Sequence, residues 1–430
     1  MMKISIVIGC LLLGLTGLGQ TNLSLLDALQ KALETNYSIR IQQMDEEIAK
    51  LNNHWGTAGR YPTISLSANS NNKADFNATD NYNQYQLLGG VNLNWTLFDG
   101  FRVSISKQRL DELENLTKGY TAVLIEGTIQ SLIASYYNVL LEEEILKVYK
   151  ENEQLSKDRA DYQQMRKDIG NAVSYEVLQA TNAYLADKAA VLLQEANLKS
   201  SMRELVYLMG EESGSYTLTG QLIAEDQNYE LDELHALMIE NNKNLKNQYI
   251  NQSLAEKAMA LARANFYPKL SLSTGVQAVN LNQNYANGAD FNSTSSNVYG
   301  NLSLSYNLFN GGVRKRAVQI AKIEEEINTI ETDEMKVSLS NQLDNLYDYY
   351  QARVGMYELS QERLKVAQIN LEISDQKFKA GTINSFNFRD VQLSYQAAAI
   401  DQLNAIYNLI DVRTSLLRLT GGIIEESVTK

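Results

Sequence analysis

The chain has 430 residues, a formal net charge of −13 and two prolines. The acidic balance argues against a nucleic-acid partner, which would need a basic surface to neutralise phosphates. Because proline removes a backbone donor and clashes inside a helix, a chain this poor in proline can form very long helices.

Residues 1–20 are predicted to be a secretory signal peptide, because Lys3 precedes an apolar stretch and small residues follow it. Cys10 has two interpretations: the cysteine of a lipoprotein cleavage site, or an ordinary residue of the apolar stretch. The second fits better, because apolar residues continue after Cys10. Removal of the peptide would leave the mature chain without a thiol, which excludes disulfides and cysteine nucleophiles. Later segments carry charges too often for a membrane-spanning helix, so a membrane protein of this sequence would have to cross by strands.

The sequence contains an internal duplication. The recurring residues keep a constant or nearly constant spacing and include these pairs: Tyr61-Pro62 and Tyr267-Pro268, Leu97-Phe98-Asp99-Gly100 and Leu308-Phe309-Asn310-Gly311, Gly170 and Gly381. We therefore predict two structural repeats, 21–230 and 231–422, followed by a C-terminal tail, 423–430.

A β-hairpin is predicted in each repeat, at 62–97 and 268–308, because apolar and polar residues alternate on both sides of a polar stretch. We expect short strands joined by polar loops at 69–84 and 280–297. The polar positions of the strands hold Ser, Asn, Thr and Gly rather than charges, which suits a sheet with one face on lipid and one on water. An ordinary half-buried hairpin produces a similar pattern.

Aromatic residues gather where the predicted strands meet helices, as the girdle of a membrane interface requires. They are Tyr61, Trp95, Phe98, Phe101, Phe266, Tyr267, Tyr306 and Phe309. Four strands cannot close a barrel, and an open sheet edge in lipid leaves backbone groups unpaired at several kcal/mol each. Closure would therefore need other copies of the chain, and three copies would supply about twelve strands.

Helical apolar spacing predicts two helices after each hairpin. Their ranges are 101–168 and 174–209 in the first repeat, and 312–379 and 384–420 in the second. At 1.5 Å per residue the longest would extend about 100 Å. One continuous helix, 231–264, is predicted before the second hairpin, and the first repeat begins with its counterpart. An equatorial segment, 210–230, is expected to hold a small strand near Tyr216 and Leu218.

These features together resemble the TolC-type outer-membrane efflux proteins over residues 24–422. The motifs that carry the resemblance are the duplication, the two Tyr-Pro strand entries, the run 308–316 and the tips 170–177 and 378–382. The resemblance implies a mainly α fold with a β-barrel contribution: a duplicated long-helix α-barrel and four transmembrane β-strands per protomer, with a twelve-stranded barrel in a homotrimer. It also implies a location in the outer membrane of a Gram-negative bacterium, with a periplasmic extension.

The function that this resemblance implies is a passive exit duct for small molecules or secreted substrates, as the outer-membrane channel of a tripartite export or type I secretion system. Its partners would be outer-membrane lipid, a periplasmic adaptor (membrane fusion) protein and an inner-membrane pump of the RND or ABC type. No cofactor, metal or nucleic acid is expected. The alternative is a structural or adhesive coiled-coil protein of the cell surface without channel activity. An enzyme is disfavoured, because no catalytic Ser-His-Asp set, carboxylate pair or phosphate loop stands out.

Family members close the periplasmic tip with aspartates six and nine residues past the tip glycine, and these positions are Asn387 and Asp390 here. In the first half Glu176, next to Tyr175, stands where many relatives have a gate-bracing aspartate. Carboxylates from three chains would repel one another, bind cations and raise each other's pKa values. The resemblance thus makes these four residues the candidate periplasmic gate. The other interpretation is that Glu176 and Asp390 are solvated charges on a helix surface.

The two tip turns are predicted to dock the adaptor, because they would lie farthest from the outer membrane. The candidate docking residues are Gly170, Asn171, Ala172, Val173, Phe378, Gly381, Thr382 and Ile383. Plain helix-connecting turns are the alternative interpretation. His54 and His235 have no ligand-spaced partners and are interpreted as surface or packing residues.

Overall fold

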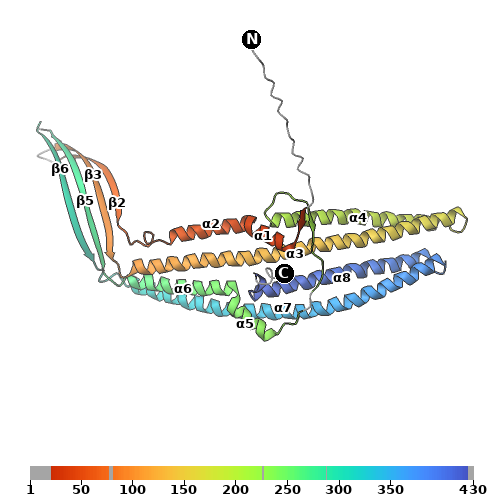
Figure 1. Ribbon diagram of the computed structural model, residues 1–430. Helices are drawn as coiled ribbons and strands as arrows, with labels where there is room; N and C mark the ends of the chain where they lie inside the picture. The colour runs from red at the N-terminus through yellow and green to blue at the C-terminus, as the bar shows by residue number, and fades with distance from the viewer. Residues whose placement is uncertain (1–20, 77–80, 225–226, 287, 425–430) are drawn as a thin grey trace, which may run out of the picture. The chain divides into compact units, whose positions relative to one another are not determined.

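The computed structural model of the chain describes residues 21–76, 81–224, 227–286 and 288–424 (Figure 1). The predicted signal peptide with Cys10, and residues 425–430 of the predicted tail, lie outside these ranges. The described chain is mainly helical with one large sheet, which confirms the expected fold class. None of its helices holds a stretch that is both long and apolar enough to cross a membrane.

The same order of elements occurs twice. The first series is α1 (Leu25–Thr35), α2 (Tyr37–Asn52), β2 (Thr63–Phe76), β3 (Asn81–Phe98), α3 (Arg102–Asp168) and α4 (Ser174–Leu208). The second is α5 (Leu231–Asn241), α6 (Lys243–Ala264), β5 (Lys269–Tyr285), β6 (Asp290–Ser305), α7 (Val313–Lys379) and α8 (Ser385–Leu419). The helices α3 and α7 both have 67 residues, and α4 and α8 both have 35. These four helices differ from the predicted ranges by at most one residue at either end.

The predicted continuous helix 231–264 is wrong, because the chain breaks at Asn242 between α5 and α6. The Asn242 side chain accepts a hydrogen bond from the backbone amide of Leu245 at 3.0 Å and so starts a new helix. Asn36 does the same between α1 and α2, where it accepts from the amide of Ser38 at 2.9 Å. Asparagine is among the best residues for this capping position. Apolar periodicity continues through both breaks, which is why it did not reveal them.

The long strands form one antiparallel sheet in the order β2-β3-β5-β6, so the two hairpins join through β3 and β5. The predicted short strands and polar loops at 69–84 and 280–297 are wrong, because each strand has between 14 and 18 residues. Pairs such as Asn72 with Tyr85 and Asn282 with Asn292 continue the ladder through the polar stretches. Strand pairing uses backbone groups, so it does not require apolar side chains.

The two faces of the sheet differ in polarity. One row across all four strands holds Leu66, Val91, Val276 and Val298, which lie opposite one another in register and are exposed. On the other face, the Tyr299 hydroxyl donates to Asn92 Oδ1 at 2.6 Å. This contact passes Gly275, where a Cβ atom would come within 3.0 Å of that hydroxyl. The sheet therefore has one apolar and one hydrogen-bonded polar face.

By packing, the chain divides into two compact units, and each contains parts of both repeats. We call Ile41–Leu124 with Ala236–Gln342 the sheet unit, because it holds β2, β3, β5 and β6. We call the unit formed by the described residues of Met1–Arg40, Ile125–His235 and Leu343–Lys430 the tip unit, because it holds the turns at Gly170 and Gly381. The repeats of the sequence are thus not the compact units of the fold.

The core of the tip unit forms around two short strands, β1 (Thr21–Leu23) and β4 (Tyr216–Leu218), which pair in parallel. The second of these is the small strand expected in the equatorial segment. Tyr136, only 1% exposed, donates its hydroxyl to the Leu23 carbonyl at 3.1 Å and accepts from the Gly220 amide at 3.1 Å. This one buried side chain therefore fastens α3 to the segments at both strands.

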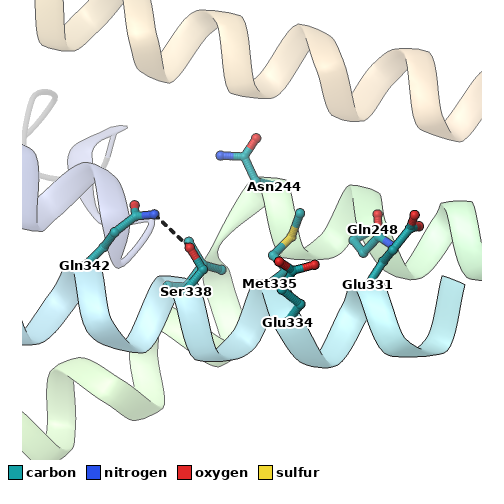
Figure 2. Close-up of a pocket in the computed structure, with 8 residues that line it drawn as sticks. Asn244, Gln248, Glu331, Glu334, Met335, Ser338 and Gln342 are labelled. Carbon is teal, nitrogen blue, oxygen red and sulfur yellow. Dashed lines mark hydrogen bonds between the residues drawn. The ribbon is translucent and has the colours of Figure 1, made fainter. Parts of the chain in front are cut away.

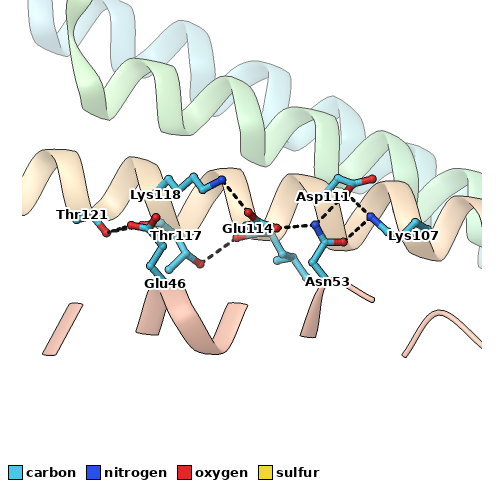
Figure 3. Close-up of polar contacts among 9 residues, drawn as sticks. Glu46, Asn53, Lys107, Asp111, Glu114, Thr117, Lys118 and Thr121 are labelled. Carbon is cyan, nitrogen blue, oxygen red and sulfur yellow. Dashed lines mark hydrogen bonds and ion pairs between the residues drawn. The ribbon is translucent and has the colours of Figure 1, made fainter. Parts of the chain in front are cut away.

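In the sheet unit, polar contacts attach the end of α2 to α3 (Figure 3). Asn53 Nδ2 donates to Asp111 at 2.9 Å and to Glu114 at 2.6 Å, while Lys107 Nζ donates to Asn53 Oδ1 at 2.7 Å. The hydrogen bond from Lys107 lowers the pKa of Asp111, and the bond from Asn53 lowers the pKa of Glu114. Both carboxylates are thus held in their charged form.

Candidate functional site

The eight predicted interface aromatics all lie in the sheet unit, at or next to strand–helix junctions. Three of them contact one another edge to face: the Phe98 ring is 5.3 Å from Phe101 and 6.5 Å from Tyr267, and Phe101 is 6.0 Å from Tyr267. The Arg314 guanidinium lies over two more, 5.2 Å from the ring of Phe266 and 5.9 Å from that of Tyr306.

The remaining three aromatics, Trp95, Tyr61 and Phe309, do not belong to these two groups. Trp95 donates its indole N–H to the Arg60 carbonyl at 2.8 Å, and Tyr61 lies 5.9 Å from the ring of His54. Phe309 is 84% exposed. Seven of the eight rings are exposed, all except Phe98. Exposed Tyr and Trp, which combine an apolar ring with a polar edge, suit the boundary between lipid and water.

Both helical tips use the same turn. The amide of Gly170 donates to the Lys167 carbonyl at 2.9 Å, and the amide of Gly381 donates to the Phe378 carbonyl at 3.0 Å. In each turn the next amide reaches one residue further back along the helix. Both glycines have a positive φ, +80° and +73°, which side chains with a Cβ rarely adopt. The repeated glycine in the sequence therefore marks a repeated helix end.

The predicted docking residues do not all reach the surface. Phe378 is only 4% exposed, and its ring stacks on Phe388 at 5.0 Å and meets the edge of Tyr162 at 5.4 Å. Its assignment to the docking surface is therefore wrong: it supports the tip from inside. Gly170, Asn171, Val173, Gly381 and Thr382 are exposed, and Ala172 and Ile383 are half-buried.

The predicted gate residues come from two helices. Asn387 and Asp390 are exposed on α8, whereas on α4 Tyr175 is exposed and Glu176 is half-buried. Within the part of the chain that the structure describes, the carboxylates of Glu176 and Asp390 have no hydrogen-bond or ion-pair partner. The structure does not join the two helices through these four side chains. Both carboxylates are therefore available to groups outside the chain.

A set of buried polar residues in the tip unit was missed at the sequence level. On α3, Asn152, Ser156, Arg159 and Gln163 follow one another along one helix face, and each is at most 4% exposed. Ser156 contacts Asp187 of α4 as well as Arg389 and Gln392 of α8, and Asn152 contacts Gln392. We call these seven residues the buried seam. The signal that could have revealed them in the sequence is their spacing: polar residues recur at helical intervals where apolar residues are usual.

Asp187 is the centre of the buried seam. Both of its oxygens accept from Arg389, with Nη1 to Oδ2 and Nη2 to Oδ1 both at 2.6 Å. The Ser156 hydroxyl also donates to Asp187. Gln392 Nε2 donates to Ser156 Oγ at 2.9 Å and to the Asn152 carbonyl at 3.0 Å. These contacts connect α3, α4 and α8 through one carboxylate.

The guanidinium of Arg159 is less well hydrogen-bonded than that of Arg389. Its Nη1 lies 3.5 Å from the Ser385 carbonyl, and its Nε is buried with no hydrogen-bond partner in the part of the chain that the structure describes. Burial, and to a smaller extent the neighbouring charge of Arg389, lower the pKa of Arg159 to about 10 against a still smaller opposing effect of Asp187. The guanidinium remains charged at neutral pH, although it has no carboxylate partner of its own.

A surface groove of about 500 Å³ lies in the sheet unit between α6 and α7 (Figure 2). It is lined by Asn244, Gln248, Glu331, Glu334, Met335, Ser338, Leu339 and Gln342. Gln342 Nε2 donates to Ser338 Oγ at 3.2 Å. The lining offers amides, hydroxyls and carboxylates in an open setting. Across the four described ranges, no three His, Cys, Asp or Glu side chains are grouped so that they could hold a metal ion.

A family model described as outer membrane efflux protein matches residues 28–211 and 234–422, one match in each predicted repeat. The chain belongs to this family. Its place is the outer membrane, with a helical part in the periplasm, and it is an outer-membrane channel of tripartite efflux systems. The predicted family, localisation and class of function are thereby confirmed. The family is one of channels. No curated protein matches the chain significantly.

Solved structures of low sequence identity share the fold of this outer membrane efflux protein. The Campylobacter jejuni CmeC outer membrane channel matches with a TM-score of 0.75 at 14% identity, over 94% of this chain and 89% of that one. The open-state MtrE outer membrane channel of Neisseria gonorrhoeae has a TM-score of 0.73 at 15% identity, over 93% and 89%. The outer membrane protein VceC of Vibrio cholerae has a TM-score of 0.69 at 14% identity, over 93% and 96%.

Proposed function

We propose that three copies of this efflux protein form one closed channel, in which three four-stranded sheets make a twelve-stranded barrel. The observation that carries this proposal is the open sheet: within the described residues, β2 and β6 each have a paired strand on one side only. Lipid offers no hydrogen bonds to a free strand edge, so each unpaired backbone group there costs several kcal/mol. Pairing of β6 with β2 of the next copy removes both edges.

Exposed apolar stripes on the helices support the same assembly. In the tip unit, Leu178, Leu185 and Leu192 of α4 and Leu359, Val366 and Ile373 of α7 recur every seven residues and are all exposed. In the sheet unit, exposed apolar residues recur at helical spacing on α2 (Ile41, Met44, Ile48, Leu51) and on α7 (Ile320, Ile323, Ile327, Ile330). A seven-residue apolar repeat is the pattern of a coiled-coil seam. Because the stripes of each unit lie on different helices, contact between copies is head to tail and can close a ring.

The proposed duct is passive, and its periplasmic end is the gate. Asn387 and Asp390 of α8, with Tyr175 and Glu176 of α4, would meet their counterparts from the other copies at the tip. Neither carboxylate has a partner among the residues that the structure describes, which supports this role. Three carboxylates brought together attract cations and repel one another. A partner that binds the open arrangement more tightly would shift the population towards it.

The exposed tip residues are the proposed docking surface for a periplasmic adaptor protein, which would link the channel to an inner-membrane pump of the RND or ABC type. This surface comprises Gly170, Asn171, Ala172, Val173, Gly381, Thr382 and Ile383. Phe378 is not part of it, because it is buried. The open space around both tip glycines leaves their backbone accessible to a partner. The cargo would be selected mainly by the pump.

The channel proposal is tested with the full mature chain in detergent and in planar bilayers. We expect a trimer by light scattering with detergent correction, and stepwise ion conductance after insertion. A monomer without conductance would instead support a structural or adhesive surface protein. Capture of an adaptor by the trimer, and its loss when Val173 and Thr382 are replaced by Asp, would test the docking surface.

A further inference from the structure

The buried seam lies between α8, which carries the candidate gate residue Asp390, and the neighbouring helices α3 and α4 of the tip unit. Away from the tip, α8 buries apolar residues, among them Leu409 and Leu416, each 1% exposed. Apolar packing depends on area and has little directionality. Towards the tip, individual polar pairs are added to the apolar contact of Phe388 with Phe378. The end of α8 nearest the gate is therefore held partly by specific, directional interactions.

The Arg389–Asp187 ion pair is the strongest of these interactions. It is bidentate, and the side chains are only 19% and 9% exposed. Removal of one partner from a buried ion pair leaves the other charge uncompensated, which is strongly unfavourable. The intact pair therefore fixes the position of α8 relative to α4 when the seam has this arrangement.

Arg159 weakens the same arrangement. The buried seam contains two guanidinium groups and one carboxylate, and Asp187 already accepts from both Arg389 and Ser156. The positive charge of Arg389 acts on Arg159, and Arg159 Nε has no hydrogen-bond partner among the described residues. Like charges repel more strongly in a medium of low dielectric constant than in water. Movement of α8 away from α3 would relieve this repulsion and expose Arg159 to solvent, with the loss only of its long contact of 3.5 Å with the Ser385 carbonyl.

We propose that Arg389 and Asp187 are positioning residues of the gate, which hold α8 in the closed tip, and that Arg159 opposes them and favours opening. This inference rests on the proposed gate at the tip. It predicts that substitutions within this one cluster change the population of the open tip in opposite directions. In a purely structural cluster, every substitution would reduce stability and none would favour the closed tip. The opposing terms would keep the two arrangements close in free energy, as a switch requires.

The test measures the position of α8 directly. Spin labels are placed at Gln179→Cys on α4 and Ser394→Cys on α8 of a Cys10→Ser chain, and the distance distribution within the tip unit is recorded. Both labelled positions are exposed. We expect Asp187→Asn and Arg389→Met to raise the population with the longer distance about tenfold or more. Exchange of the two charges in Asp187→Arg with Arg389→Asp should restore the original distribution at least partly, and Arg159→Met should reduce the longer-distance population.

The matched control is Asp401→Asn, which removes an exposed ion pair between α8 and Arg363 of α7. It should leave the distances unchanged. Parallel conductance recordings on unlabelled variants should show more leak for Asp187→Asn and less for Arg159→Met.

The outcomes separate the two proposals. Distances that respond as expected in a chain that neither trimerises nor conducts would support the role of the seam and contradict the channel assembly. A conducting trimer in which Asp187→Asn behaves like Asp401→Asn would overturn the positioning role. It would also be overturned if Arg159→Met lengthened the distance as Asp187→Asn does, because the seam would then be only structural.

Discussion

Two side chains near the same tip turn differ in exposure and therefore in role. Asp390 is exposed and has no side-chain partner among the described residues, whereas Phe378, twelve residues earlier, is buried between aromatic rings. The sequence placed both near the tip glycine Gly381. Only the structure shows that one is available to neighbouring copies and the other is not.

Asp390→Asn should weaken the block of the channel by multivalent cations. Three carboxylates at one level attract such ions, and an amide removes the charge while keeping the shape. Single-channel recordings with a trivalent cation on the periplasmic side measure the block. Asp401→Asn, farther along α8, is the control. Equal block in the wild type and Asp390→Asn would remove Asp390 from the gate.

Phe378→Ala should destabilise the tip by about 3–5 kcal/mol, the usual range for loss of a buried Phe ring. The ring stacks on Phe388, so its removal leaves a cavity between α7 and α8. Hydrogen exchange of amides near Gly381 reports this local loss. Phe386→Ala on α8 is the matched control, because Phe386 is 67% exposed and its loss should change stability by less than about 0.5 kcal/mol. Similar exchange in both variants would contradict the supporting role of Phe378.

At the scale of elements, close contacts decide which strands and helices can pack. In the sheet, a Cβ atom on Gly275 would lie 2.3 Å from the Val91 carbonyl, too close for any side chain. Gly275→Val should therefore separate β5 from β3 and reduce the yield of folded trimer in detergent. Gly89→Val on β3 is the control, because no atom lies within 4 Å of that position. Normal assembly of Gly275→Val would show that the strands do not approach so closely.

The attachment of α2 to α3 should depend on pH. The folded pKa values of Asp111 and Glu114 lie below the ordinary values of 3.8 and 4.5. The contribution of these carboxylates to stability is therefore complete above the unfolded values and is lost as the pH falls through the lower folded values.

Trp55 reports on this attachment, because the guanidinium of Arg60 lies 4.7 Å and Lys107 Nζ 5.9 Å from its ring. In a Trp95→Phe chain, which keeps one of the two tryptophans, its fluorescence should change below about pH 4. Asn53→Ala should move the change to higher pH, because Asn53 stabilises the charged form of Glu114. A change at the same pH in both chains would argue against the role of Asn53.

At the scale of the whole molecule, one chain leaves features that only other copies can cover. Two strand edges and several apolar stripes are unpaired in the described structure. Burial of this apolar area favours association, and the proposed head-to-tail contact would form a closed ring rather than an open fibre when the rotation matches.

Leu185→Glu should prevent or strongly weaken trimer formation, because it places a charge in the centre of the proposed α4 seam. The fraction of trimer is measured by light scattering in detergent. Leu193→Glu is the control: Leu193 is 65% exposed on the same helix but lies outside the seven-residue stripe. A trimer of normal stability with Leu185→Glu would exclude α4 from the interface between copies.

The sequence by itself determined the features that depend on near neighbours along the chain. Apolar periodicity and two positive-φ glycines set the ends of α3, α4, α7 and α8 within one residue, and recurring motifs revealed the duplication. Helix and turn formation depend on residues a few positions apart, so these signals are local.

Only the tertiary structure decided which distant residues meet. Asp187 and Arg389 are separated by 202 positions, and nothing in the local pattern pairs them. The joining of the hairpins through β3 and β5, the extension of the strands through polar stretches and the burial of Phe378 were likewise not visible in the sequence. Periodicity shows which face of a helix or strand is buried, but the partner of that face is set by the packing of all elements together, which minimises exposed apolar area and unpaired polar groups.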